Sequence, residues 1–250
     1  MRSIEPVAVV TGGAGAIGAA VCRALAAVGF AVVIGYRETP ERAEAMIPTL
    51  AGTGHAAMRA PVTDSGALQS LAIAVRERYA RCDVLVNCAG TTRFVAHHDL
   101  DGLDDALIDA ILATNVRGSF AAVRALAPLL RASTQAGGAV VVNISSLAAR
   151  TAIGSNVMYC ASKAALDSLT LSLARALAPA VRVVSVSPGL VDTEFVKSLD
   201  TRWRDEQEAR TPLGRLAAPA EIAAAVVAVV RDLTFTTGCV LAVDGGRPLN

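Results

Sequence analysis

The segment Tyr159-Cys-Ala-Ser-Lys163 places a phenol and an ammonium group four residues apart, at the start of a predicted helix that runs to about Leu177. Side chains at this spacing lie on one face of a helix. A free tyrosine has a pKa of about 10, and moving that pKa to neutrality requires roughly 4 kcal/mol. A cation about 4 Å away at an effective dielectric of ~20 supplies that amount. The pair predicts a tyrosine that acts as a general acid or base, although the same spacing also arises by coincidence.

A second chemical signal is the glycine-rich segment Thr11-Gly-Gly-Ala-Gly-Ala-Ile-Gly18, which separates an apolar run from a helical stretch. Glycine permits a tight turn and a close backbone approach, and the first turn of a helix presents unpaired N–H groups to an anion. Glycine-rich turns are also common at strand-to-helix joints, so the spacing of Gly13, Gly15 and Gly18 is weak evidence alone. In this context it predicts a dinucleotide site.

The remaining elements would position these groups. Seven runs read as strands: Val7 to Thr11, Ala31 to Tyr36, roughly His55 to Ala60, Val84 to Asn87, Ala139 to Ser145, Arg182 to Ser187 and Cys239 to Val243. Several are continuously apolar, which indicates a parallel sheet covered on both faces. We expect residues 1–250 to form one α/β domain with a Rossmann-like, doubly wound, seven-stranded parallel sheet and a ligand crevice at the carboxyl ends of the strands.

Composition narrows the partners. The chain has 250 residues, 53% of them hydrophobic, with a formal net charge of +1, so it has no basic face to attract nucleic acid. Its five cysteines and three histidines show no metal-ligand spacing, which predicts reduced thiols and no metal. The N-terminus does not resemble a signal peptide, and apolar runs such as Ile222 to Val230 are too short to span a membrane. We expect a cytoplasmic protein that binds a small molecule and no membrane.

Taken together, the motifs resemble those of the short-chain dehydrogenase/reductase family over nearly the whole chain. The matching segments are Thr11 to Gly18 (T-G-x-x-x-G-x-G), Asn87 to Gly90 (N-N-A-G), Asn115, Ser146, Tyr159 with Lys163 (Y-x-x-x-K), and Ser187 to Thr193 (a P-G segment). Ser145 and Ser146 are adjacent, but the family's active serine commonly lies 13 residues before the tyrosine, which selects Ser146.

The resemblance implies an oxidoreductase with four catalytic residues. Tyr159 would exchange a proton with the substrate oxygen, and Ser146 would hydrogen-bond that oxygen. Lys163 would bind the ribose hydroxyls and lower the tyrosine pKa, while Asn115 would hold a water that links Lys163 to solvent. Hydride would pass between the nicotinamide and the substrate carbon. Without the other motifs, Asn115 would be read as a polar residue within a helix that bonds to backbone.

The resemblance also implies a set of cofactor contacts. They are Thr11, Gly12, Gly13, Gly15, Ala16, Ile17, Gly18, Tyr36, Arg37, Val62, Asn87, Ala89, Gly90, Tyr159, Lys163, Pro188, Gly189, Val191 and Thr193. Three departures from the family pattern lie close by: Ala16 replaces a glycine, Cys88 replaces the second asparagine of N-N-A-G, and Pro61 replaces an acid that contacts adenine. None of them touches the catalytic group.

The second predicted strand ends Ile34-Gly-Tyr-Arg37, where an NAD enzyme normally has an acid for the ribose 2′-hydroxyl. With Tyr36 in that place and Arg37 next to it, the site favours the 2′-phosphate of NADP(H). Glu38 keeps NAD(H) possible, because an acid two positions later can reach the ribose.

The pattern is closest to 3-oxoacyl-acyl-carrier-protein reductase-like members, whose reaction is NADPH reduction of a β-keto thioester. Residues 133–138 and 177–181, where such reductases often dock an acidic carrier, contain no basic residue, which puts carrier binding in doubt. A sugar, polyol, steroid or xenobiotic carbonyl remains open. So does a regulatory or scaffold protein that binds the cofactor without turnover.

Two further expectations concern assembly and motion. Helices Leu166 to Leu177 and Ile222 to Val230 are hydrophobic on most faces, which by resemblance predicts dimer and tetramer contacts and a homotetramer. The polar segment Asp200 to Arg210 reads either as a surface helix on a mobile substrate lid at about residues 190–214 or as an ordinary solvated helix.

Overall fold

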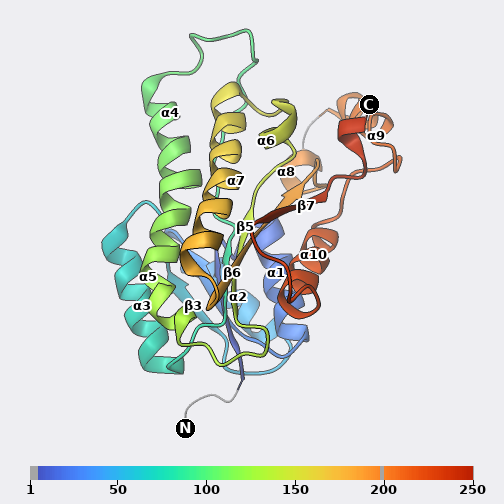
Figure 1. Cartoon of the computed structure of the whole chain (residues 1–250). Coiled ribbons are helices and arrows are strands. Elements are labelled where there is room, and N and C mark those ends of the chain that lie inside the picture. The colour runs from blue at the N-terminus through green and yellow to red at the C-terminus, as the bar shows by residue number, and fades with distance from the viewer. Residues whose placement is uncertain (1–4, 198–199, 250) are drawn as a thin grey trace.

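A computed structural model describes residues 5–197 and 200–249 of the chain and shows one seven-stranded parallel sheet in the order β3-β2-β1-β4-β5-β6-β7 (Figure 1). The strands are β1 (Val7–Thr11), β2 (Ala31–Tyr36), β3 (Ala56–Arg59), β4 (Val84–Asn87), β5 (Ala139–Ile144), β6 (Val181–Pro188) and β7 (Cys239–Val243). The predicted fold class and all seven strands are confirmed, with ends that differ from the prediction by at most one residue.

Helices connect the strands and cover both faces of the sheet (Figure 1). The α-helices are α1 (Ala16–Ala27), α2 (Pro40–Met46), α3 (Ser65–Tyr79), α4 (Asp105–Leu112), α5 (Ser119–Arg131), α6 (Ala148–Thr151), α7 (Val157–Leu177), α8 (Glu194–Lys197), α9 (Thr201–Ala209) and α10 (Pro219–Arg231). Short 3₁₀ turns lie at Ile47–Thr49 and Arg247–Leu249, and a π-helical segment, Ala113–Gly118, joins α4 to α5.

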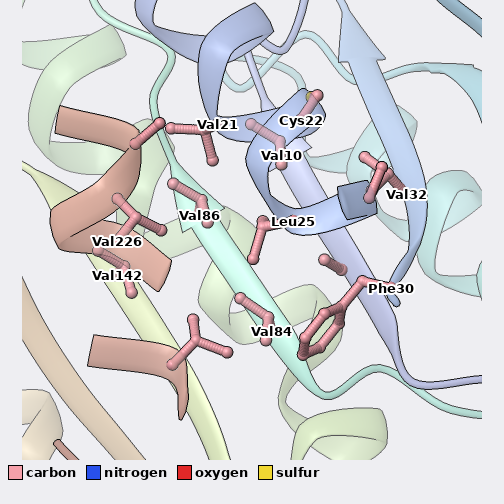
Figure 2. Close-up of a cluster of buried hydrophobic side chains, with 14 of the residues drawn as sticks. Val10, Val21, Cys22, Leu25, Phe30, Val32, Val84, Val86, Val142 and Val226 are labelled. Atoms are coloured by element: carbon pink, nitrogen blue, oxygen red, sulfur yellow. The ribbon is translucent and has the colours of Figure 1, made fainter. Parts of the chain in front are cut away.

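Two hydrophobic clusters, one on each face of the sheet, form the core. On one face α1, α2 and α10 pack against the strands, and Figure 2 shows Leu25 of α1 and Val226 of α10 beside valines of the sheet. On the other face α3, α5 and α7 pack against the alternate side chains of the same strands. The central strands therefore carry apolar side chains toward both faces along most of their length, and polar residues such as Asn87 and Asn143 lie near their carboxyl ends.

A chain of buried polar side chains crosses the second face and fixes α7 on the sheet. Asn87 donates to Asn143 Oδ1 (2.9 Å), Asn143 donates to Thr170 Oγ1 (2.8 Å), and Thr170 pairs with Ser185 Oγ (2.8 Å). Breaking one link would leave a buried group unsatisfied, at a cost of roughly 1–3 kcal/mol. These bonds set where α7 lies along the strands, and with it the side chains of its first turns.

Within the described residues, the helical stretch Asp105–Arg131 is the only one long and apolar enough to cross a membrane. The core helix of a globular protein passes the same test. Here Leu126 and Leu130 of α5 are fully buried in the second cluster. In this structure the α5 part of the stretch covers the sheet.

Candidate active site

The glycine-rich segment forms a turn between β1 and α1 that lies against the turn after β4. Gly12 has φ +62°, and a Cβ added to it would lie 2.9 Å from the Cα of Ala89. Gly13 donates its N–H to the carbonyl of Gly35 (2.9 Å), which holds the turn beside β2. A side chain at Gly12 would thus collide with the neighbouring turn.

The N-terminus of α1 opens to solvent at this turn. Gly15 is the N-cap and supplies no side-chain cap, and both Gly15 and Ala16 are exposed. The first N–H groups of a helix without a capping side chain favour an anion. Because Ala16 is exposed, its methyl group has room, and its departure from the family pattern is accommodated. The cradle fits the pyrophosphate of a dinucleotide.

Two predicted cofactor residues, Thr11 and Asn87, use their side chains for hydrogen bonds within the protein. Thr11 Oγ1 accepts hydrogen bonds from the backbone N–H groups of Cys88 (3.2 Å) and Ala89 (3.3 Å). The buried amide nitrogen of Asn87 donates to Asn143 and to the carbonyl of Ser119. Their side chains fix the turn after β4.

Helix α7 presents Tyr159 and Lys163 at the carboxyl end of the sheet. Asn156 caps the helix, because its Oδ1 accepts from the N–H of Tyr159 (2.6 Å). The side chain of Ser146, from the turn after β5, lies beside the half-buried Tyr159 and acts to lower the pKa of its phenol. The structure thereby brings together the serine and the tyrosine that the sequence selected.

Lys163 is buried behind the tyrosine, with only 6% of its surface exposed. Its Nζ donates to the backbone carbonyl of Ile144 (2.9 Å) and lies 5.7 Å from the centroid of the Tyr159 ring. Burial lowers the pKa of Lys163 to about 8, against smaller raising effects of Cys88 and Asp167. A Cβ on exposed Gly90 would lie 3.7 Å from Nζ, so the open surface at Gly90 leads to the ammonium.

The sequence predicted that Lys163 lowers the pKa of Tyr159, and for the chain alone this prediction is wrong. Burial raises the pKa of Tyr159 above its ordinary value, and only the hydrogen bond to Ser146 acts in the opposite direction. The ammonium faces the ring and a backbone carbonyl, and it is itself desolvated, so its field does not outweigh the burial of the phenol. Tyr159 therefore carries its proton at neutral pH.

Asn115 lies in the π-helical segment and is fully buried. Its side chain accepts from the N–H of Thr91 (2.8 Å) and donates to the carbonyl of Thr91 (3.0 Å) and to Ser162 Oγ (3.0 Å). Its Oδ1 lies near the same open surface of Gly90 that leads to Lys163. The asparagine ties the turn after β4 to α7, a contact that the sequence did not predict.

The P-G segment forms the other wall of the site. The carbonyl of Pro188 accepts from the N–H of Leu147 (2.8 Å), and a Cβ on Gly189 would lie 2.9 Å from the Cα of Asp244. Val191 forms an isolated bridge with Ala217. Thr193 accepts a weak hydrogen bond from the N–H of Val196 (3.4 Å) at the start of α8.

The polar segment that was predicted from Asp200 to Arg210 is the helix α9, capped by Asp200, whose Oδ1 accepts from the N–H of Trp203 (3.0 Å). Arg204 pairs with Asp192 Oδ1 (2.9 Å), which joins α9 to the P-G segment. Residues 198–199 of the predicted lid lie outside the described residues. Whether this segment moves remains a prediction.

At the end of β2, exposed Arg37 forms an ion pair with exposed Glu38 (3.1 Å). Sequence reasoning missed a second cation here, because the strand register is needed to find it. Arg59 of β3 lies directly opposite Tyr36 of β2 in the strand register, and it is exposed. The register pair two residues earlier, Ile34 with Ala57, faces the first cluster, so Tyr36 and Arg59 share that face.

Val62 lies in the turn after β3 and is buried against Gly118 of the π-helical segment, where an added Cβ would lie 2.7 Å from Val62 Cγ2. Pro61 accepts the N–H of Asp64 through its carbonyl (3.0 Å). This turn brings Val62 to the same edge of the sheet as Tyr36.

Comparisons with known proteins identify the family of this chain. A family model described as enoyl-(acyl carrier protein) reductase matches residues 12–247. A Streptomyces violaceoruber protein named ketoacyl reductase 2 of granaticin polyketide synthase is 38% identical over 246 residues, which cover 98% of this chain and 96% of the relative. The chain belongs to the short-chain dehydrogenase/reductase family. It is an oxidoreductase that acts on CH–OH groups, in a family that uses nicotinamide dinucleotides.

Two further proteins illustrate the range of this family. A cis-4-hydroxycyclohexanecarboxylate dehydrogenase from Sinomonas cyclohexanicum is 37% identical over 246 residues, 97% of this chain and 96% of that protein. The crystal structure of a short-chain dehydrogenase/reductase from Burkholderia xenovorans superposes with a TM-score of 0.92 at 36% identity and covers 100% of both chains. The activities named for the two relatives differ, so family membership leaves the substrate open.

The close approach at Gly12 generates a test of the cradle. Gly12→Ala should weaken NADPH binding at least tenfold, because its methyl would meet the Ala89 backbone and push the two turns apart. Gly29→Ala is the matched control: Gly29 also has positive φ (+92°), but no atom lies within 4 Å of its added Cβ. Both variants pay backbone strain of about 1–2 kcal/mol.

The measurement is a fluorescence titration of NADPH, with thermal unfolding in parallel. Both variants should lose a few degrees of Tm, and only Gly12→Ala should lose affinity. Equal NADPH affinity in the two variants would contradict the proposed cradle.

Proposed function

We propose that this chain is an NADP(H)-dependent carbonyl reductase, or the corresponding alcohol dehydrogenase, with Tyr159 as the general acid and base. The observation that carries the proposal is the arrangement at the carboxyl end of the sheet. The side chain of Ser146 lies close enough to Tyr159 to lower the pKa of its phenol, and the buried ammonium of Lys163 lies behind the tyrosine ring. A cofactor-binding regulator without turnover has no use for a buried cation behind a paired phenol and hydroxyl.

Each residue of the site has a separate role in the proposed reaction. Bound nicotinamide dinucleotide supplies or accepts a hydride. Ser146 hydrogen-bonds the substrate oxygen, and Tyr159 gives its phenolic proton to that oxygen as the carbonyl becomes an alcohol. Burial keeps Tyr159 protonated at neutral pH, which is the state that reduction requires. In the oxidation direction the same phenol, once ionised, takes the alcohol proton.

Lys163 and Asn115 support the tyrosine. An ammonium has three donors, and the protein bond to Ile144 uses one of them. The other two are available to the ribose hydroxyls, and the positive charge stabilises the phenolate that forms after proton transfer. Asn115, beside the same opening at Gly90, fits the proposed relay of a proton from solvent to Lys163 through a water.

The cofactor preference rests on charge at the end of β2. Arg37 alone is largely neutralised, because Glu38 pairs with it at 3.1 Å. Arg59 lies beside Tyr36 on the same face, and no ion pair of its side chain is seen among the described residues. With two guanidinium groups and one carboxylate, the site carries a net positive charge that suits a 2′-phosphate.

For the substrate, we propose a β-keto thioester or another carbonyl compound. The named ketoacyl reductase supports the first, and the cyclohexanecarboxylate dehydrogenase supports a free cyclic alcohol or ketone. Sugar, polyol and steroid carbonyls remain alternatives. A homo-oligomer, dimer or tetramer, is also proposed, supported by the exposed apolar side chains of Phe120 (40%) on α5 and Leu171 (46%) on α7.

The catalytic assignment predicts the effect of removing one hydroxyl. Tyr159→Phe should lower kcat/KM for NADPH-dependent carbonyl reduction by about 10²–10⁴-fold, the usual contribution of a positioned proton donor, and leave NADPH affinity within about threefold. Activity is measured as NADPH oxidation against a β-keto ester, a cyclic ketone, a ketose and a steroid ketone.

Tyr79→Phe is the matched control. Its hydroxyl donates to the carbonyl of Gly54 (2.7 Å) far along the chain from α7, so its loss should cost stability and no activity. If wild-type protein binds NADPH and reduces none of these carbonyls, the regulatory reading replaces the proposal. Full activity in Tyr159→Phe would exclude the tyrosine as the proton donor.

Because their positive charges lie at the end of β2, Arg37 and Arg59 should both set the cofactor preference. Arg59→Gln should weaken NADPH binding about tenfold and leave NADH binding within twofold, since only NADPH carries the 2′-phosphate. Arg37→Asp should reverse the preference toward NADH. Arg131→Gln, which removes one exposed charge at the end of α5, controls for net charge. Unchanged ratios of kcat/KM for the two cofactors in both arginine variants would overturn the NADP(H) assignment.

A further inference from the structure

A cavity of about 500 Å³ opens beside the turn that carries Ser146. Its lining includes three arginines, Arg150, Arg210 and Arg247, together with apolar Leu147 and Ile153. We propose that this cavity binds an anionic group of the substrate, a carboxylate or a phosphate, and so selects substrates in which such a group is joined to the reacting carbonyl. The proposal rests on the proposed function, because it assigns a substrate class to the same site.

The cavity adjoins the catalytic residues through short stretches of chain. Leu147 directly follows Ser146, and its carbonyl accepts the N–H of Arg150 (3.0 Å) within the turn that begins α6. Arg150 is four residues beyond the serine, which at a helical rise of 1.5 Å per residue is about 6 Å along the chain. On the other side Ile153 precedes Gly154, where an added Cβ would lie 3.2 Å from the ring of Tyr159. An anion in the cavity and a carbonyl at Ser146 are within the span of one small molecule.

Arg150 and Arg247 have no carboxylate partner in the described part of the chain that would cancel their charge. Arg247 donates to the carbonyl of Gln207 (2.9 Å), to Thr211 Oγ1 (3.3 Å) and to Gln207 Oε1, all of them neutral acceptors. Exposed Arg150 makes no side-chain hydrogen bond in the described part of the chain. In residues 5–197 and 200–249, no carboxylate forms an ion pair with Arg150 or Arg247. Positive charge that lines a hollow attracts an anion and supplies planar, paired donors to it.

Arg210 and Arg247, both in the cavity wall, affect each other through their positive charges. Burial lowers the pKa of Arg247, and the positive charge of Arg210 lowers it further. Two like charges held side by side raise the free energy of the protein, and a bound anion would offset that repulsion. The contacts of Arg247 with Gln207 and Thr211 also fix its position, so it is preorganised for a ligand.

The location separates this cavity from the dinucleotide cradle. The cradle is built on β1, β2 and β4 and on the N-terminus of α1, whereas the cavity is walled by α6, the end of α9 and the C-terminal turn after β7. Figure 1 shows α6 and α9 at the same end of the molecule as the C-terminus. Its size suits a small molecule, because ligand pockets commonly measure about 300–1,000 Å³.

The test compares charged and neutral forms of one carbonyl compound. The probes are 4-oxopentanoate with its methyl ester, and dihydroxyacetone phosphate with dihydroxyacetone. In wild type the anion of at least one pair should have a KM at least tenfold below that of its neutral form, and the pair that shows the difference identifies carboxylate or phosphate. Arg150→Gln should raise KM for that anion about tenfold and leave the neutral form within twofold, while Arg150→Lys should restore part of the difference.

Arg131→Gln, which also removes one exposed positive charge, should change neither KM. A binding readout is independent of turnover: Trp203 on α9 is the only tryptophan of the chain, and its fluorescence should respond to 4-oxopentanoate or inorganic phosphate in wild type and more weakly in Arg150→Gln.

The outcomes separate the two proposals. Reduction of neutral carbonyls with no preference for either anion overturns the anion site and leaves the reductase function standing. If no carbonyl is reduced, the proposed function fails, and the Trp203 titration decides the anion site alone. A change in Trp203 fluorescence on addition of the anion that is equal in wild type and Arg150→Gln, or absent in both, overturns the anion site.

Discussion

The burial of the Lys163 ammonium is the constraint on which the site depends. A cation with 6% of its surface exposed and one backbone acceptor, the carbonyl of Ile144, is poorly solvated, and its pKa falls to about 8. The opening at Gly90 leaves the route to this cation free of side chains. A ligand that brings hydroxyl groups and negative charge to that opening would replace the missing solvation. Such a ligand would offset the cost of burying a positive charge where α7 packs against the sheet.

Buried polar side chains around Lys163 fix the position of its helix, α7, relative to the sheet. Asn143 and Thr170 connect α7 to the sheet, and Asn115 connects it to the turn after β4. All three are fully buried, so each would cost free energy if its partner moved. The network therefore favours one placement of α7, and that placement puts the phenol of Tyr159 against Ser146. Strand order and helix packing are thus linked to the geometry of proton transfer.

Much of this could be predicted from the sequence, for identifiable reasons. Buried parallel strands form nearly continuous apolar runs, so runs such as Val32 to Ile34 revealed both the strands and their covered faces. The spacing of Tyr159 and Lys163 revealed a shared helix face. Electrostatics could not be predicted in the same way, because the pKa of Tyr159 depends on burial and on the direction in which Nζ points. Arg59 could be found only from the strand register, and the cavity only from the way α6, the end of α9 and the C-terminal turn line one hollow, which no local pattern contains.

The most direct test is a titration of the lysine side chains themselves, which is feasible because the chain has only two lysines, Lys163 and Lys197. With ¹³C-labelled lysine, NMR of the Cε signals in the protein without cofactor should show one group with a midpoint near pH 8. The other should titrate above the ordinary lysine pKa, because Glu194 hydrogen-bonds Lys197 and raises its pKa. The low-pH signal should be missing from Lys163→Gln. Two lysines that both titrate above pH 10 would contradict a desolvated ammonium at the centre of the site.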